Sequence, residues 1–179
     1  MSLPPLPHHG DAPDPLQVIG AALAARPYAR RGVSPREEPV RVVLVDDHAV
    51  LRVGLRALLE KTPDITGVGD GSNGVEAVAL ATQLTPDVVV LDLDMPGGDG
   101  ATATRELVRR DPSIRVLVLS YHAEEEYLVP LLDAGASGYL AKDAADRELV
   151  DAIRVVASGD VYVRPRVARL LAAHMREQC

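Results

Sequence analysis

Short apolar runs alternate with amphipathic stretches along most of the chain. Residues 40–45 form the first apolar run, and leucines then recur at 51, 55, 58 and 59, which is the spacing of one helix face. Four further pairs follow, with apolar runs at 65–69, 87–91, 114–120 and 137–141 and helical stretches near 73–84, 101–110, 124–134 and 146–157. Five such units predict an α/β fold, a five-stranded parallel sheet covered by helices on both faces.

The two ends of the chain differ from this repeat. Seven of the fourteen prolines and four arginines lie in residues 1–38, which predicts a poorly ordered arm. Near the other end, an amphipathic stretch starts at Pro165, and proline suits the first turn of a helix. We therefore expect an arm at 1–38, one folded domain at 39–158, and a linker segment with a short helix at 159–179.

Composition narrows the possible functions. The net charge of −7 argues against a nucleic-acid-binding surface, which normally carries a basic stripe. Cys179 is the only cysteine and permits no disulfide within the chain, as is usual for proteins of reducing compartments. No apolar run reaches the roughly 18 residues that span a bilayer. These features predict a cytoplasmic protein without membrane contact, and its core must be aliphatic because Phe and Trp are absent.

Polar and charged residues follow the predicted strands at one end of the sheet. In chain order they are Asp46 and Asp47 after the first strand, Asp92 after the third, Ser120 after the fourth and Lys142 after the fifth. Each residue alone would be read as a helix cap or as an uninformative surface residue. Because ligands bind at the carboxyl ends of the strands in open α/β sheets, the same placement on successive strands predicts a functional site.

The chemistry of these side chains points to a phosphoryl group. Three close carboxylates repel one another unless a cation neutralises them, and carboxylate oxygens suit Mg²⁺. The ammonium of Lys142 and the hydroxyl of Ser120 add two donors for phosphoryl oxygens. Asp92 is the best candidate for the nucleophile, because a carboxylate can form an acyl phosphate.

At these residues the sequence resembles the receiver domains of bacterial two-component response regulators. It is most similar to the NarL/FixJ group, whose members usually carry a LuxR-type DNA-binding module. The matching segments are 43–55, 86–100, 116–122 and 134–143, and the similarity runs from about 40 to 157. The resemblance implies a doubly wound (βα)5 flavodoxin-like fold with strand order 2-1-3-4-5, followed by a C-terminal linker helix.

The resemblance also implies roles for the acidic residues. Asp92 would accept a phosphoryl group from a histidine kinase, so the protein would be a switch rather than an enzyme. Asp46 and Asp47 would form the acidic pair of the Mg²⁺ site. Asp92 and the backbone carbonyl of Asp94 would complete the set of metal ligands.

The remaining roles concern the switch itself. Lys142 would contact the phosphoryl group, Ser120 would be the switch hydroxyl, and Tyr139 would be the aromatic residue that turns inward when Ser120 moves. The switched surface would lie around the fourth helix, fifth strand and fifth helix. A homodimer is expected through that surface or through the first and fifth helices.

Several features depart from the family pattern. Gly98 stands where the family usually has an apolar residue, and Asp143 replaces the proline that follows the lysine in many receivers. Pro130 lies inside the predicted fourth helix, where it removes a hydrogen bond, so we expect that helix to be kinked or shortened and irregular across 129–132. Relatives continue into a helix-turn-helix module, which this sequence does not contain, so no DNA contact is expected from the chain as given.

Two alternative functions share some of these residues. Haloacid-dehalogenase phosphatases also form an aspartyl phosphate at an Asp-x-Asp motif, which Asp92 and Asp94 match, but that family places its nucleophile after the first strand. The second alternative is a degenerate receiver that acts through protein contacts alone, for which Gly98 and Pro130 are the supporting features.

Overall fold

Strands and helices alternate through the folded part of the chain. The computed structural model describes residues 37–95, 100–121 and 125–177. The strands are β1 (Val40–Val45), β2 (Ile65–Gly71), β3 (Val88–Asp92), β4 (Arg115–Ser120) and β5 (Gly138–Ala141). The helices are α2 (Ala49–Glu60), α3 (Gly74–Leu84), α4 (Gly100–Arg110), α5 (Glu125–Asp133), the 3₁₀ turn η1 (Lys142–Ala144), α6 (Ala145–Ala157) and α7 (Pro165–Glu177). The five predicted strand–helix units are confirmed, and the largest shift of a strand boundary is the extension of β2 to Gly71.

The five strands form one parallel sheet in the order β2-β1-β3-β4-β5. This order confirms the prediction from the resemblance. The chain first steps outward from β1 to β2 and then returns to the other side of β1 with β3. The carboxyl ends of β1 and β3 therefore meet where the strand order reverses, which is the usual place for a ligand site in such sheets.

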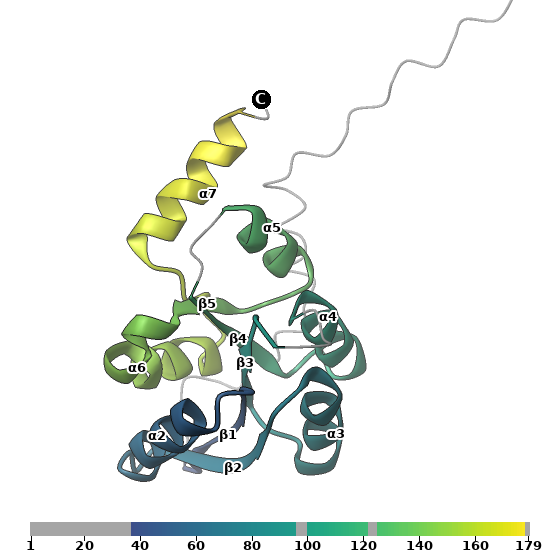
Figure 1. Ribbon diagram of the computed structural model, residues 1–179, viewed down its shortest axis with the longest axis vertical. Coiled ribbons are helices and arrows are strands. Elements are labelled where there is room, and N and C mark those ends of the chain that lie inside the picture. Colours follow the sequence, from purple (N-terminus) through teal and green to yellow (C-terminus); the bar gives the residue numbers. More distant parts are fainter. Residues whose placement is uncertain (1–36, 96–99, 122–124, 178–179) are drawn as a thin grey trace, which may run out of the picture.

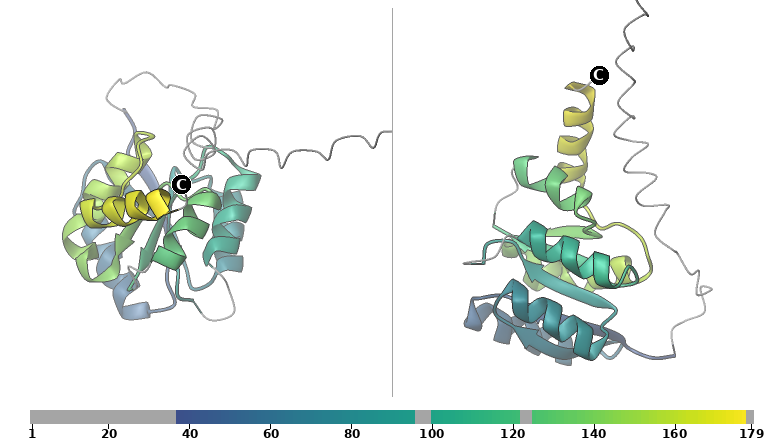
Figure 2. Two further views of the ribbon diagram at one scale, coloured as in Figure 1. Left: turned by 90° about the horizontal axis from the view of Figure 1, so that it is seen from above. Right: turned by 90° about the vertical axis from the view of Figure 1, so that its right-hand side faces the viewer.

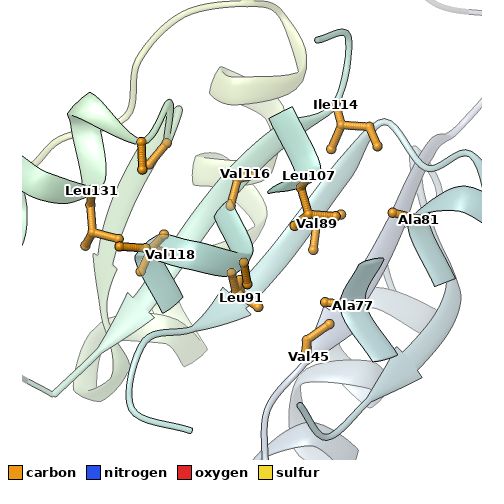
Figure 3. Packing of buried hydrophobic residues seen from close by; sticks show 14 of the residues in the cluster. Val45, Ala77, Ala81, Val89, Leu91, Leu107, Ile114, Val116, Val118 and Leu131 are labelled. Atoms are coloured by element: carbon orange, nitrogen blue, oxygen red, sulfur yellow. The ribbon is translucent and has the colours of Figure 1, made fainter. Parts of the chain in front are cut away.

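Helices cover both faces of the sheet (Figure 1). Alternate residues of each strand point to opposite faces, so Val89 and Leu91 join α3, α4 and α5 in one apolar cluster (Figure 3). Val88 and Val90 join α2 and α6 in the other cluster. The buried apolar side chains are aliphatic apart from Met95 and Tyr139, and each fully buried leucine or valine contributes on the order of 1.5–3 kcal/mol.

Pro130 does not interrupt α5. The helix runs without a break from Glu125 to Asp133, so the expected irregularity across 129–132 is wrong as far as continuity is concerned. Its nine residues make it shorter than the other described α-helices, which have 11 to 13. The main-chain bonds from Gly135 to Leu132 and from Ala136 to Leu131 close its end, and the φ of 100° at Gly135 suits glycine. Gly98 lies outside the described residues.

The last helix lies beside α5. Two views place α7 next to α5 and away from the centre of the sheet (Figures 1 and 2). Helix α7 begins at Pro165, as the sequence predicts, and the residues before it run along β5. Within the described ranges, every helix is too short or too polar to cross a bilayer.

Candidate functional site

The carboxyl ends of β1 and β3 place two aspartates side by side. Val45 pairs with Leu91 across the two strands, and Asp46 and Asp92 are the next residues on each. Both side chains are buried, with relative exposures of 2% for Asp46 and 0% for Asp92. Two buried carboxylates on neighbouring strands repel each other, so the site needs positive charge.

Lys142 supplies one positive charge. It follows β5 as the first residue of η1, and its Nζ lies 2.9 Å from Oδ2 of Asp92 and 3.2 Å from Oδ2 of Asp46. The side chain of Lys142 is fully buried. The structure therefore brings together the predicted residues of β1, β3 and β5, and we call Asp46, Asp92 and Lys142 the buried charge cluster.

The protonation of this cluster reflects competition between burial and charge. Burial raises the pKa of Asp92 to about 6, and the nearby charge of Asp46 adds to the increase. The backbone N–H of Asp94, which donates to Oδ1 of Asp92 at 2.9 Å, and the ammonium of Lys142 both lower this pKa. Burial lowers the pKa of Lys142, but the contacts of Lys142 with Asp92 and Asp46 raise this pKa by more, so the net shift is upward. Once Asp92 has lost its proton, Asp92 and Lys142 therefore form an ion pair.

The acidic side chains fit a divalent cation. Asp46, Asp47, His48 and Asp92 each offer one ligand atom, and these atoms all lie within 4.8 Å of one another. Three oxygens of this group face the nitrogens of Lys142 or His48: Oδ2 of Asp46, Oδ1 of Asp47 and Oδ2 of Asp92. Three carboxylates against one ammonium leave an excess of negative charge. Hard cations such as Mg²⁺ prefer oxygen donors of this kind.

Ser120 and Tyr139 lie beside the buried charge cluster. Ser120 ends β4 and is fully buried, and its hydroxyl donates to Oδ2 of Asp94 at 3.3 Å. Burial raises the pKa of Tyr139, and a hydrogen bond with Ser120 opposes that increase. With only 4% of its surface exposed, Tyr139 already points inward in this structure.

Two aromatic side chains that the sequence analysis did not select also contact the site. Nδ1 of His48 lies 3.2 Å from Oδ1 of Asp46 and 3.2 Å from Oδ1 of Asp47. Lys142 Nζ lies 4.9 Å from the ring centre of Tyr121, whose ring also meets the ring of His48 edge-on. His48 directly follows the acidic pair and Tyr121 directly follows Ser120, so adjacency along the chain was the available signal.

Arg52 was also missed, although it holds the first loop of the site. Its guanidinium donates to the backbone carbonyl of Asp46 at 2.5 Å and to that of Gly71 at 3.4 Å. Its Nε lies 3.0 Å from Oδ2 of Asp70, which also pairs with Arg56. Arg52 thus ties the ends of β1 and β2 together from the first turns of α2. The two carbonyls that it binds leave no signature in the sequence, because every residue has a backbone carbonyl.

Comparisons with known proteins agree with this geometry. The response regulator receiver domain family matches residues 42–154. The transcriptional regulatory protein DegU of Brevibacillus brevis is 40% identical over 140 residues, or 78% of this chain and 59% of DegU. The nitrate/nitrite response regulator protein NarL of Escherichia coli (strain K12) is 39% identical over 140 residues, or 78% of this chain and 65% of NarL. The crystal structure of a LuxR-family two-component response regulator from Aurantimonas sp. SI85-9A1 gives a TM-score of 0.72 at 36% identity, covering 76% of this chain and 98% of that chain.

The family match covers the strands and the site together. It includes β1 to β5 with Asp46, Asp92 and Lys142, and it favours a receiver over the haloacid-dehalogenase alternative. The chain spans 59% and 65% of the length of the two curated relatives. Because the family matches residues 42–154, the chain belongs to the response regulator receiver family and contains the receiver domain of a two-component response regulator.

Proposed function

We propose that Asp92 accepts a phosphoryl group from a histidine kinase and that Mg²⁺ is required for this step. The observation that carries the proposal is the fully buried Asp92 carboxylate with the ammonium of Lys142 at 2.9 Å. A buried carboxylate can act as a nucleophile and form an acyl phosphate. The fixed ammonium of Lys142 would then stabilise the negative charge of that product.

The proposed step needs little beyond positioning. An Oδ atom of Asp92 attacks phosphorus, the bond from phosphorus to the kinase histidine nitrogen breaks, and that nitrogen keeps the electron pair. Lys142 sits where the added phosphoryl oxygens must go, so its charge offsets theirs. The N–H of Asp94 holds Asp92 in place through Oδ1. These contacts support at most self-catalysed gain and loss of the phosphoryl group, not turnover of a separate substrate.

The proposed Mg²⁺ ligands are Asp46, Asp47, Asp92 and the backbone carbonyl of Asp94. When bound, the ion would neutralise the excess carboxylate charge and accept oxygens of the phosphoryl group. The short distances among the ligand atoms of Asp46, Asp47 and Asp92, all within 4.8 Å of one another, support this assignment.

The proposed output is a change in the surface around α5, β5 and α6, which are the fourth helix, fifth strand and fifth helix of the domain. Ser120 and Tyr139 would act as the switch pair. Tyr139 on β5 is hydrogen-bonded to Ser120, and Ser120 in turn donates to Asp94. We keep the proposed division into a receiver at 39–158 and a linker segment after it. Dimerisation through this surface or through α2 and α6, and control of transcription by the longer protein, belong to the same proposal.

Labelling with acetyl phosphate and Mg²⁺ tests the proposal. The chain should become stably phosphorylated, Asp92→Asn should not, and EDTA should abolish labelling. Asp94→Asn is the matched control, because it keeps the backbone carbonyl and the nucleophile and should still be labelled. Rapid multiple turnover of phosphate esters that needs Asp94 would support a phosphatase instead. Absence of labelling in the folded wild-type chain would support the degenerate receiver.

A further inference from the structure

The outer edge of β5 is covered by residues that lie outside the strand–helix repeat. Tyr162 forms a parallel bridge with Gly138. The N–H of Tyr139 donates to the carbonyl of Tyr162 at 3.0 Å, and the N–H of Tyr162 donates to the carbonyl of Ser137 at 3.1 Å. These two bonds place Tyr162 against the outer edge of β5, and the edge strand of a sheet is a position that readily pairs with another segment.

We call residues 161–164 the edge segment, and the side chains of Tyr162, Val163 and Arg164 also hold it in place. The hydroxyl of Tyr162 donates to Oε2 of Glu148 on α6 at 2.8 Å, and Arg164 lies 3.2 Å from Oε1 of Glu148. Val163 packs against the apolar cluster that contains Tyr139. Helix α7 begins directly after the edge segment, so docking of this segment sets where α7 starts, beside α5 (Figure 1).

Gly138 makes this close pairing possible. A Cβ atom at this position would lie 2.9 Å from the carbonyl oxygen of Tyr162, 3.0 Å from Cδ1 of Leu117 and 3.1 Å from Cβ of Tyr162. The leucine side chain can turn away, but the backbone oxygen of Tyr162 can give way only if the chain around it moves. The docked position of the edge segment therefore depends on the absence of a side chain at 138.

Tyr139 connects this edge with the functional site. Its backbone N–H holds the edge segment, whereas its buried side chain bonds to Ser120. Ser120 in turn donates to Asp94, two residues after Asp92. One residue thus belongs both to the proposed switch pair and to the surface on which the edge segment docks.

We propose that the outer edge of β5 is a docking surface for the edge segment, residues 161–164, and that its occupancy depends on the inward position of Tyr139. The proposal rests on the proposed function and adds the route by which the state of Asp92 reaches α7. An outward ring would leave the cluster against which Val163 packs, and would remove part of what the edge segment binds. By linkage, a ligand that favours inward Tyr139 tightens docking, and docking tightens binding of that ligand by the same factor.

Amide hydrogen exchange of the full chain, measured by NMR, tests the docking. Gly138→Ala should accelerate exchange of the Tyr162 N–H about tenfold, because the added methyl group overpacks the contact. Tyr162→Phe keeps the backbone pairing and should have a smaller effect. Gly54→Ala is the matched control, because a Cβ at this glycine of α2 meets nothing within 4 Å. Equal exchange of Tyr162 in Gly138→Ala and wild type would overturn the docking.

Two further measurements test the coupling to Tyr139. Ser120→Ala removes the partner of the Tyr139 hydroxyl and should accelerate exchange of Tyr162 about fivefold, whereas beryllium fluoride with Mg²⁺ should slow it in wild type by a similar factor. Gly138→Ala should then weaken beryllium fluoride binding, followed by ¹⁹F NMR. If Gly138→Ala changes exchange while Ser120→Ala and beryllium fluoride do not, docking is independent of Tyr139 and the coupling is wrong. If beryllium fluoride fails to bind at all, the proposed function fails, and the Ser120→Ala result still decides the coupling.

Discussion

Two ion-pair clusters of this protein have the same contact distance and opposite electrostatics. Lys142 lies 2.9 Å from Asp92 in the buried charge cluster, and Arg109 lies 2.9 Å from Glu106 on the surface of α4. Burial raises the pKa of Asp92 to about 6 despite its partner, whereas the hydrogen bonds from Arg109 and Arg110 lower the pKa of Glu106 to about 2. The difference is solvent, since both side chains of the first pair are fully buried and those of the second are 67% and 33% exposed.

The buried charge cluster and the surface cluster of Glu106, Arg109 and Arg110 therefore differ in what they contribute to stability and to reactivity. A surface pair forms with little desolvation and contributes little to stability, because water and salt screen it. The buried charge cluster loses the hydration of three charged groups, which only partly compensate one another. We infer that the buried cluster lowers the stability of the fold and keeps a reactive carboxylate ready for a cation and a phosphoryl group.

The largest expected effect is the loss of the buried cation. Lys142→Met leaves two buried carboxylates without the ammonium that neutralises them, and should lower the free energy of unfolding by about 3 kcal/mol at pH 8. The loss should shrink toward pH 5, where Asp92 takes up a proton. Urea unfolding at both pH values measures this. Arg109→Met removes a cation at the same distance on the surface and should leave the unfolding midpoint unchanged; similar losses in both variants would contradict the comparison.

The second expected effect is a pH-dependent gain in the free energy of unfolding when the buried carboxylate of Asp92 is removed. The pKa of Asp92 lies near 6 in the folded chain and at the ordinary 3.8 when unfolded. The folded state therefore binds the proton more tightly, and stability falls as the pH rises from about 4 to 6 and is level above that. Asp92→Asn should be more stable than wild type by roughly 1–3 kcal/mol above pH 7 in EDTA, and the gain should vanish near pH 4. A constant difference across this range would show that Asp92 titrates normally.

A third prediction separates two arginines that share one partner. Both Arg52 and Arg56 pair with Asp70, but only Arg52 donates to the backbone carbonyl of Asp46. Arg52→Gln should raise the half-saturating Mg²⁺ concentration about tenfold, as expected for a residue that orients metal ligands, and Arg56→Gln should raise it less than twofold. Mg²⁺ binding by calorimetry on the unphosphorylated chain measures this, and labelling rates at saturating Mg²⁺ should differ much less. Equal changes in the half-saturating Mg²⁺ concentration for the two variants would show that Arg52 does not specifically orient the metal ligands.

The smallest expected effect concerns salt. The pKa of Glu106, followed by NMR of its carboxyl carbon, should lie below 4.5 at low ionic strength and move back toward 4.5 in 1 M NaCl, because the exposed pair is screened. The pKa of Asp92 should change little under the same conditions, because the buried cluster is shielded from screening by dissolved Na⁺ and Cl⁻. A large salt shift at Asp92 would mean that the cluster is open to solvent.

Most of the fold and much of the site could be predicted from the sequence. The apolar runs and helix faces placed all five strands, because alternation between β and α periodicity is a local property of the chain. The convergence of Asp46, Asp92 and Lys142 followed from their common position after parallel strands. The expected irregularity of α5 across 129–132 was wrong as to continuity, because the helix runs unbroken through Pro130, although at nine residues it is the shortest of the described α-helices.

Other contacts could not be predicted, because they join backbone groups of distant segments. Arg52 binds the carbonyls of Asp46 and Gly71, and Tyr162 pairs with the edge of β5, and neither contact requires a recognisable side-chain pattern at its partner. His48 and Tyr121 had only the weaker signal of adjacency to Asp47 and Ser120, and their side-chain contacts with Asp46, Asp47 and Lys142 depend on how the strand ends meet.

The amino-acid sequence by itself determined the order of strands and helices, the aliphatic core and the residues that gather at one end of the sheet, because periodicity and strand polarity are written along the chain. The tertiary structure alone decided how deeply the charges are buried, and hence the direction in which each pKa moves. It also decided that the segment before α7 lies on β5. Desolvation and backbone pairing depend on what surrounds a residue in space, which a linear pattern does not contain.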